Sequence, residues 1–143
     1  MVSLLLPENL GLMLPVSLPA FVLFLLALCI GALITSSISM ITVCLTFKTM
    51  SAKGTATIVN TVCGLLGGLY IPLPLMPQAI QNVLNYLPFR YVTDLPFRIY
   101  IGNVSYQTAL MFIGIALVWL VALILIGKLF LSKVLKKTVI QGG

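Results

Sequence analysis

The chain has 143 residues and a net charge of +6, and 61% of its residues are hydrophobic while only 7% are charged. A soluble domain of this length has no core large enough for so much apolar surface, so the chain needs lipid as its solvent. Histidine is absent and the acidic residues number two, which removes the groups needed for most metal centres, paired-carboxylate hydrolysis and histidine-activated nucleophiles. The basic residues are spread between apolar segments, so no nucleic-acid partner is expected. Composition therefore predicts an integral membrane protein without a catalytic site, metal ion or cofactor.

Three apolar segments are long enough to cross a bilayer as helices, at about residues 18–47, 55–75 and 107–131. Helices are expected because lipid cannot satisfy the open backbone groups of other structures. The first segment has about 30 residues, which is more than a perpendicular span needs, so we expect it to tilt or to extend beyond the bilayer. The sequence predicts an all-α integral membrane fold with three transmembrane helices.

Lysine positions predict the orientation of these spans. Lys48 and Lys53 flank the turn between the first two spans, and four further lysines lie at the end of the third. Positive residues concentrate on the cytoplasmic side, so the C-terminus is predicted to be cytoplasmic in a multi-pass protein of the cell membrane. The N-terminus and the segment after residue 77 then lie outside. An external start without a targeting signal leads us to expect that the chain is the C-terminal part of a longer protein.

Small and hydroxyl residues gather on one face of each of the first two spans. In the first span they recur every three or four residues, at Gly31, Thr35, Ser39 and Thr42. In the second span the corresponding residues are Thr57, Asn60, Thr61, Gly64 and Gly68, the last two in a Gly-x-x-x-Gly pattern. Such faces bring membrane helices together, and they can also form a weakly polar wall of a substrate path. The third span lacks this pattern and is expected to face lipid, with Trp119 near its middle contacting the core or a neighbour.

The segment at about residues 77–102 predicts two short helices on the external side. In its first half the apolar residues fall on one helical face and the amide residues on the other. A second short helix is expected to begin near Thr93 and Asp94, with Pro96 in its first turn, and to end at Gly102. Two short, proline-bounded helices beside a span indicate a re-entrant hairpin, which is tolerated at membrane depth only inside protein or along a cavity.

Charged residues and prolines make this hairpin a candidate external gate. Arg90, Asp94 and Arg98 follow one another at i,i+4 spacing, so they share one helical face. They are typical of a local charge network near the lipid headgroups, and they can also serve in gating or in contacting an anionic substrate. The candidate gate residues are Pro72, Pro77, Pro88, Arg90, Asp94, Pro96 and Arg98.

The stretch from Gly67 to Gly102, GGLYIPLPLMPQAIQNVLNYLPFRYVTDLPFRIYIG, has a specific order of glycines and prolines. A span ends in Gly-x-x-Ile-Pro-Leu, a proline-led short helix and a Leu-Pro-Phe follow, and a second proline-led helix precedes the last span. In this order the chain resembles the C-terminal half of the permeases of the ABC-2 transporter family. The ending, residues 139–143, resembles that of the family's drug and viologen exporter subgroup. The matching residues are Gly68, Ile71, Pro72, Leu73, Pro77, Leu87, Pro88, Phe89, Pro96 and Gly102.

The resemblance implies that residues 1–143 form a partial transmembrane domain like that of type V exporters. In that family a six-span subunit pairs with a second permease subunit, as a homodimer or heterodimer, and with cytoplasmic ABC ATPase subunits that power outward transport. The first two spans of this chain then lie near the subunit interface and the path. Residues 72–102 then form the external gate.

The leading hypothesis is a membrane permease subunit, present as a C-terminal fragment, of an ATP-binding cassette exporter. It forms part of the translocation path and of the external gate, while a partner subunit hydrolyses ATP. The alternative is a small non-transporting membrane protein that binds and regulates a larger complex. Half of a secondary transporter is a further alternative, but such proteins normally carry an intramembrane ionisable residue, and the interior of the predicted spans has none.

Overall fold

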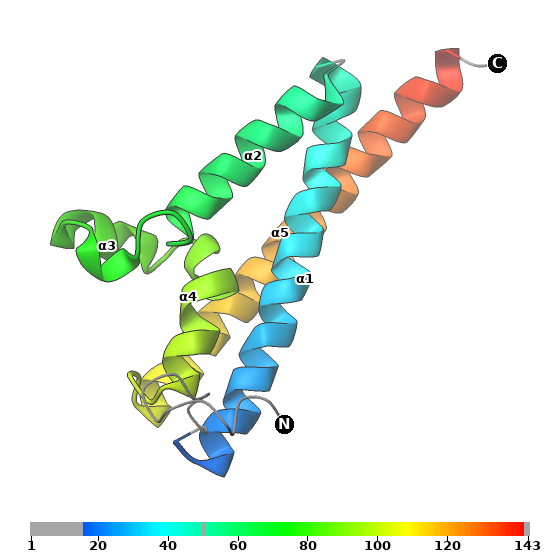
Figure 1. Cartoon of the computed structure of the whole chain (residues 1–143). Helices are drawn as coiled ribbons and strands as arrows, with labels where there is room; N and C mark the ends of the chain where they lie inside the picture. Colours follow the sequence, from blue (N-terminus) through cyan, green and yellow to red (C-terminus); the bar gives the residue numbers. More distant parts are fainter. Residues whose placement is uncertain (1–15, 50, 142–143) are drawn as a thin grey trace, which may run out of the picture.

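The computed structural model describes residues 16–49 and 51–141, and these residues form helices and turns without a strand. In chain order the helices are α1 (Leu18–Thr49), α2 (Ala52–Leu66), the 3₁₀ helix η2 (Leu73–Leu75), α3 (Gln78–Leu84), α4 (Phe89–Tyr100) and α5 (Tyr106–Gln141). The predicted all-α fold is confirmed. The long helices α1 and α5 run together, α2 leaves α1 at its C-terminal end, and α3 lies to one side (Figure 1).

Two of the described helices are long and apolar enough to cross a membrane, by length and composition. They are α1 over Leu18–Phe47 and α5 over Tyr106–Lys136. Both exceed the roughly 20 residues that cross a hydrocarbon core of about 30 Å. These two helices coincide with the first and third predicted spans.

One face of α5 packs against α1 through small and branched side chains. The buried residues of this contact are Leu23, Ala27, Ile30 and Ile34 of α1 with Ala109, Ile113, Ala116 and Leu120 of α5. Alanines in such a contact let two helix backbones approach closely. The prediction that the third span simply faces lipid is wrong for this face, because the many Leu, Ile and Val residues around the alanines masked it. Other faces of α5, with Val118 and Val121, are exposed.

α2 is shorter than the predicted second span. It has 15 residues, which is about 22 Å of helix, and it ends at Leu66. Gly68 has a left-handed backbone with a φ of +83°, and the Leu69 N–H donates to the Gly64 carbonyl at 2.9 Å. This is the bond pattern of a Schellman helix stop, which favours glycine at the left-handed position. The prediction of one helical span over 55–75 is therefore wrong at its C-terminal end, and the Gly-x-x-x-Gly pattern ends the helix instead of forming a packing face.

Two short helices follow, as predicted, but the second starts earlier than expected. α4 begins at Phe89, directly after Pro88, so Pro96 lies in its interior and not in its first turn. A proline just before a helix costs no helical hydrogen bond, which explains why α4 starts there and not near Thr93. The position of this hairpin relative to a membrane stays a prediction.

α4 runs antiparallel to α1 and lies along the first half of α1. Near the end of α4, the ring centroid of Tyr100 is 5.1 Å from that of Phe24. Near its start, the backbone of α4 lies against Gly31, where an added Cβ would be 3.2 Å from the Tyr91 carbonyl oxygen. α2 starts beside the C-terminal end of α1 and slopes away from it, α4 lies along the first half of α1, and α3 is set aside between them (Figure 1).

Candidate functional site

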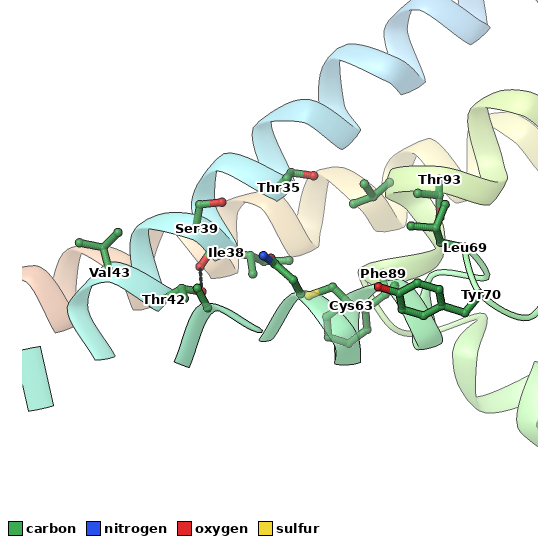
Figure 2. Close-up of a pocket in the computed structure, with 14 residues that line it drawn as sticks. Thr35, Ile38, Ser39, Thr42, Val43, Cys63, Leu69, Tyr70, Phe89 and Thr93 are labelled. Carbon is green, nitrogen blue, oxygen red and sulfur yellow. Dashed lines mark hydrogen bonds between the residues drawn. The ribbon is translucent and has the colours of Figure 1, made fainter. Parts of the chain in front are cut away.

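A cleft of about 460 Å³ opens where α1, α2 and the start of α4 meet (Figure 2). We call it the α1–α2 cleft. Among the described residues, those that line it are Thr35, Ile38, Ser39, Thr42, Val43, Ala56, Asn60, Cys63, Gly64, Leu69, Tyr70, Phe89, Val92 and Thr93. None of these lining side chains carries a charge, and six of the fourteen residues carry a hydroxyl or amide group.

The α1 wall of the cleft contains three residues that the helical spacing had grouped, Thr35, Ser39 and Thr42. Thr35 Oγ1 donates to the Gly31 carbonyl at 3.0 Å, and Thr42 Oγ1 donates to the Ile38 carbonyl at 2.8 Å (Figure 2). Both hydroxyls are thus satisfied within their own helix, so they add little polarity to the cleft. Gly31 is not part of this wall, because it lies under the backbone of α4.

The α2 wall differs from the predicted face. Its lining residues are Ala56, Asn60, Cys63 and Gly64. Asn60 and Gly64 were predicted, whereas Thr57 and Thr61 are exposed and are not among the lining residues. Gly68 is also outside the wall, because it belongs to the turn that ends α2. The face of α2 that lines the cleft therefore keeps Asn60 and Gly64 of the predicted face and has Ala56 and Cys63 in place of Thr57 and Thr61.

A close contact holds the end of α2 against α4. Thr93 Oγ1 donates a hydrogen bond to the Gly67 carbonyl. A Cβ on Gly67 would lie 3.0 Å from Thr93 Oγ1 and 3.1 Å from the Phe89 carbonyl oxygen, so the absence of a side chain lets the two helices approach. Sequence reasoning missed this contact, because it joins residues 26 positions apart and leaves no local pattern.

We expect Thr93→Val to lower the free energy of unfolding by about 1 kcal/mol, because it keeps the shape of the side chain and removes its bond to Gly67. The matched control is Thr57→Val, whose hydroxyl donates to the Lys53 carbonyl of its own helix at 2.8 Å. The control should change the free energy of unfolding by less than about 0.5 kcal/mol. Thermal unfolding of the purified proteins measures both, and equal losses would contradict the assigned role of Thr93.

Tyr70 is a lining residue that no sequence signal marks. The turn after α2 folds it back so that its ring covers Gly64, where an added Cβ would lie 2.6 Å from Tyr70 Cε2. Its place depends on the left-handed Gly68 and not on helical periodicity. Glycine at position 64 therefore serves to seat an aromatic side chain at the end of the cleft.

The predicted charged network forms on the side of α4 that faces α5. Asp94 Oδ2 lies 3.1 Å from Arg90 Nε and 3.4 Å from Arg98 Nε. Arg90 is only 7% exposed, and its Cζ lies 5.2 Å from the ring centroid of Phe112 on α5. None of the three charged residues lines the α1–α2 cleft. The network therefore joins α4 to α5 and is separate from the cleft wall.

The remaining predicted gate residues, the prolines, shape the short helices. Pro72, Pro77 and Pro88 directly precede η2, α3 and α4, and Pro96 is buried in α4. The loop between α3 and α4 is held by two hydrogen bonds, from Trp119 Nε1 to the Tyr86 carbonyl at 2.6 Å and from the Tyr91 hydroxyl to the Asn85 carbonyl. The predicted neighbour contact of Trp119 is confirmed. Through these bonds the loop between α3 and α4 is attached to both α4 and α5.

Comparison with known proteins identifies one family. Residues 2–142 match the model of the family described as ABC-2 family transporter protein. No curated protein and no solved structure matches the chain. The matched range includes all the described helices.

Proposed function

The chain belongs to the ABC-2 transporter family, and from that premise we propose that it is a permease subunit of an ATP-binding cassette exporter in the cell membrane. A separate cytoplasmic ABC ATPase hydrolyses ATP, and a second permease subunit, identical or different, completes the path. The observation that carries this proposal is the family match over residues 2–142, together with two helices apolar and long enough to cross a bilayer.

In this proposal α1 and α5 cross the bilayer in the same direction, with their C-terminal ends in the cytoplasm. Their parallel packing supports the orientation, because Ala109 shares a core with Leu23 while Gly127 lies against Met40 further along. Lys48 near the end of α1, Lys53 near the start of α2 and the lysines at the end of α5 then lie on one side. Positive residues on one side are the usual mark of the cytoplasmic face.

The α1–α2 cleft is our candidate for a segment of the substrate path. The hydroxyls of Thr35, Thr42 and Thr93 are bonded to backbone carbonyls, so the polar groups left for a ligand on the helices of the cleft are those of Ser39 and Asn60. Moving a charged group into such surroundings costs several kcal/mol. The lining therefore favours an uncharged, largely apolar substrate.

We assign the external gate to α3 and α4. The start of α4 lines the cleft, and its Thr93 bonds the end of α2. The far end of α4 packs on Phe24, in the half of α1 that this orientation places outside. A tilt of α2 during the ATP cycle therefore moves α4, which connects the cleft to the external side.

Asn60→Leu is expected to lower ATP-driven export about fivefold, because it removes one of the two polar side chains, Ser39 and Asn60, that the helices of the cleft leave for a ligand. The matched control is Thr61→Leu, at the next position but exposed outside the cleft, which should leave export within about twofold of the wild type. The measurement is efflux of a panel of uncharged fluorescent dyes from cells that contain the complete complex, divided by the amount of complex in the membrane. Equal losses in the two variants would remove the cleft from the path.

A further inference from the structure

α4 has more positive than negative charge. It carries Arg90 and Arg98 but only one carboxylate, Asp94, which is the single acidic side chain among the described residues. Both arginines contact the same oxygen, Asp94 Oδ2, at 3.1 and 3.4 Å. The other acidic residue of the chain, Glu8, lies outside the described residues. One carboxylate neutralises one guanidinium, so a charge of +1 remains on this face of α4.

The two arginines differ in exposure, which decides where this charge is available. The side chain of Arg90 is 9% exposed and lies over the Phe112 ring, so Arg90 is held between α4 and α5. The side chain of Arg98 is 30% exposed. An external anion therefore has access to Arg98, while Arg90 forms an ion pair with Asp94 on the buried side of α4.

Arg98 lies at the height where a membrane-crossing α1 enters the lipid headgroups. The ring centroids of the neighbouring Phe97 and Tyr100 lie 6.4 and 5.1 Å from that of Phe24, so this part of α4 is level with Phe24. A hydrocarbon core of about 30 Å takes about 20 residues of helix. If the hydrocarbon core begins on the cytoplasmic side at Lys48, it ends on the external side at about residue 28. Phe24 then lies about 6 Å beyond this external boundary. Lipid phosphates lie in this zone.

A second estimate from α5 agrees. Measured back from Lys128, about 20 residues reach the beginning of α5. That part of α5 shares the buried core with Leu23, the residue before Phe24. Both helices therefore place the exposed arginine of α4 near the external headgroups.

We propose that Arg98, supported by Arg90 and Asp94, binds the phosphate of an anionic phospholipid in the external leaflet. Arginine suits this role because its planar guanidinium matches phosphate oxygens and stays charged. The excess charge of +1 favours anionic over zwitterionic phospholipids. A headgroup with a net charge of −1 neutralises α4, whereas a zwitterionic headgroup brings its own cation. The inference rests on the proposed orientation, in which α1 crosses the bilayer with its N-terminal half outside, and does not depend on the exporter role.

The test places a reporter beside the site. Phe97 is 63% exposed and adjacent to Arg98, so Phe97→Trp puts an indole there, and the chain without this change gives the Trp119 background. The full chain is reconstituted in vesicles that contain phosphatidylglycerol or phosphatidylcholine brominated at the top of the acyl chain. We expect half-maximal quenching at a phosphatidylglycerol content about fivefold lower than the phosphatidylcholine content that is needed. This ratio corresponds to the attraction between one surface arginine and anionic lipid.

Arg98→Gln should abolish this preference. Lys133→Gln, near the C-terminal end of α5 and far from Arg98, should keep it. Equal quenching by the two lipids in the reporter chain overturns the proposal, and this outcome needs no further variant to fold. An unchanged preference in Arg98→Gln also overturns it. Millimolar inorganic phosphate should leave the preference intact, and its loss would assign the site to a soluble anion instead of a lipid.

Discussion

Asp94→Asn is expected to lower the free energy of unfolding by about 3 kcal/mol, the effect of removing one partner from a buried ion pair. Among the described residues, Asp94 is the only one whose carboxylate contacts both arginines of α4, at 3.1 and 3.4 Å. Its loss leaves Arg90, which is 7% exposed, without a counter-charge between α4 and α5. Thermal unfolding of the purified chain, followed by circular dichroism, measures the change.

Two comparisons separate charge from shape in this experiment. Asp94→Glu keeps the charge and should cost less than about 1 kcal/mol. Arg98→Gln removes the more exposed partner of Asp94, so it should lower the free energy of unfolding by less than Asp94→Asn does. If Asp94→Asn and Asp94→Glu unfold at the same temperature, the ion pairs do not hold α4 in place.

Gly31→Val is expected to lower the free energy of unfolding by about 2 kcal/mol, as overpacking does in a close-packed interior. An added Cβ at this position would lie 3.2 Å from backbone atoms of Tyr91 and Val92, and backbone cannot swing aside as a long side chain does. The two further methyl groups of valine force α4 away from α1. That displacement also carries Thr93 away from Gly67, so export should fall with stability.

The control for Gly31 is Gly114→Val in α5. A Cβ there meets nothing within 4 Å among the described residues. Valine has a higher helix propensity than glycine, so this variant should be as stable as the wild type or slightly more stable. A loss of stability in Gly114→Val equal to that in Gly31→Val would show that glycine is needed for a reason other than contact with α4.

The spacing of residues in the sequence correctly grouped the hydroxyl residues of the α1 wall of the cleft, because α1 is one uninterrupted helix. Residues three and four apart stay on one face of such a helix, and Thr35, Ser39 and Thr42 lie together in the cleft as that rule requires. The same rule placed the charges of α4 correctly, since Arg90, Asp94 and Arg98 form one network. Local spacing is therefore reliable wherever one helix carries the whole set.

The second wall was less predictable, because it depends on contacts between distant segments. Gly64 and Gly68 were interpreted as a packing pair, but the φ of +83° at Gly68 ends the helix between them. The contact of Gly67 with Thr93 holds the end of α2 against α4, and Thr57 is exposed outside the cleft. Neither the glycine stop nor this long-range bond has a periodic signature.

The third span was misjudged for a related reason. Its apolar residues lie on every face, so its sequence gives no sign of which face meets protein. The alanines at positions 109 and 116 decide this, because they allow the close approach to α1. Composition can identify such a helix as membrane-compatible, but the contact face depends on the partner helix.

The most direct test of the proposed function is to purify the tagged full chain in mild detergent from the cells that normally make it and to identify its partners by mass spectrometry. We expect an ABC ATPase with nucleotide-binding motifs to be recovered at a fixed ratio to the chain, and ATP hydrolysis by the complex to depend on the chain's presence. Recovery of the chain in a membrane complex without any such ATPase would contradict the exporter assignment and favour a regulatory membrane protein.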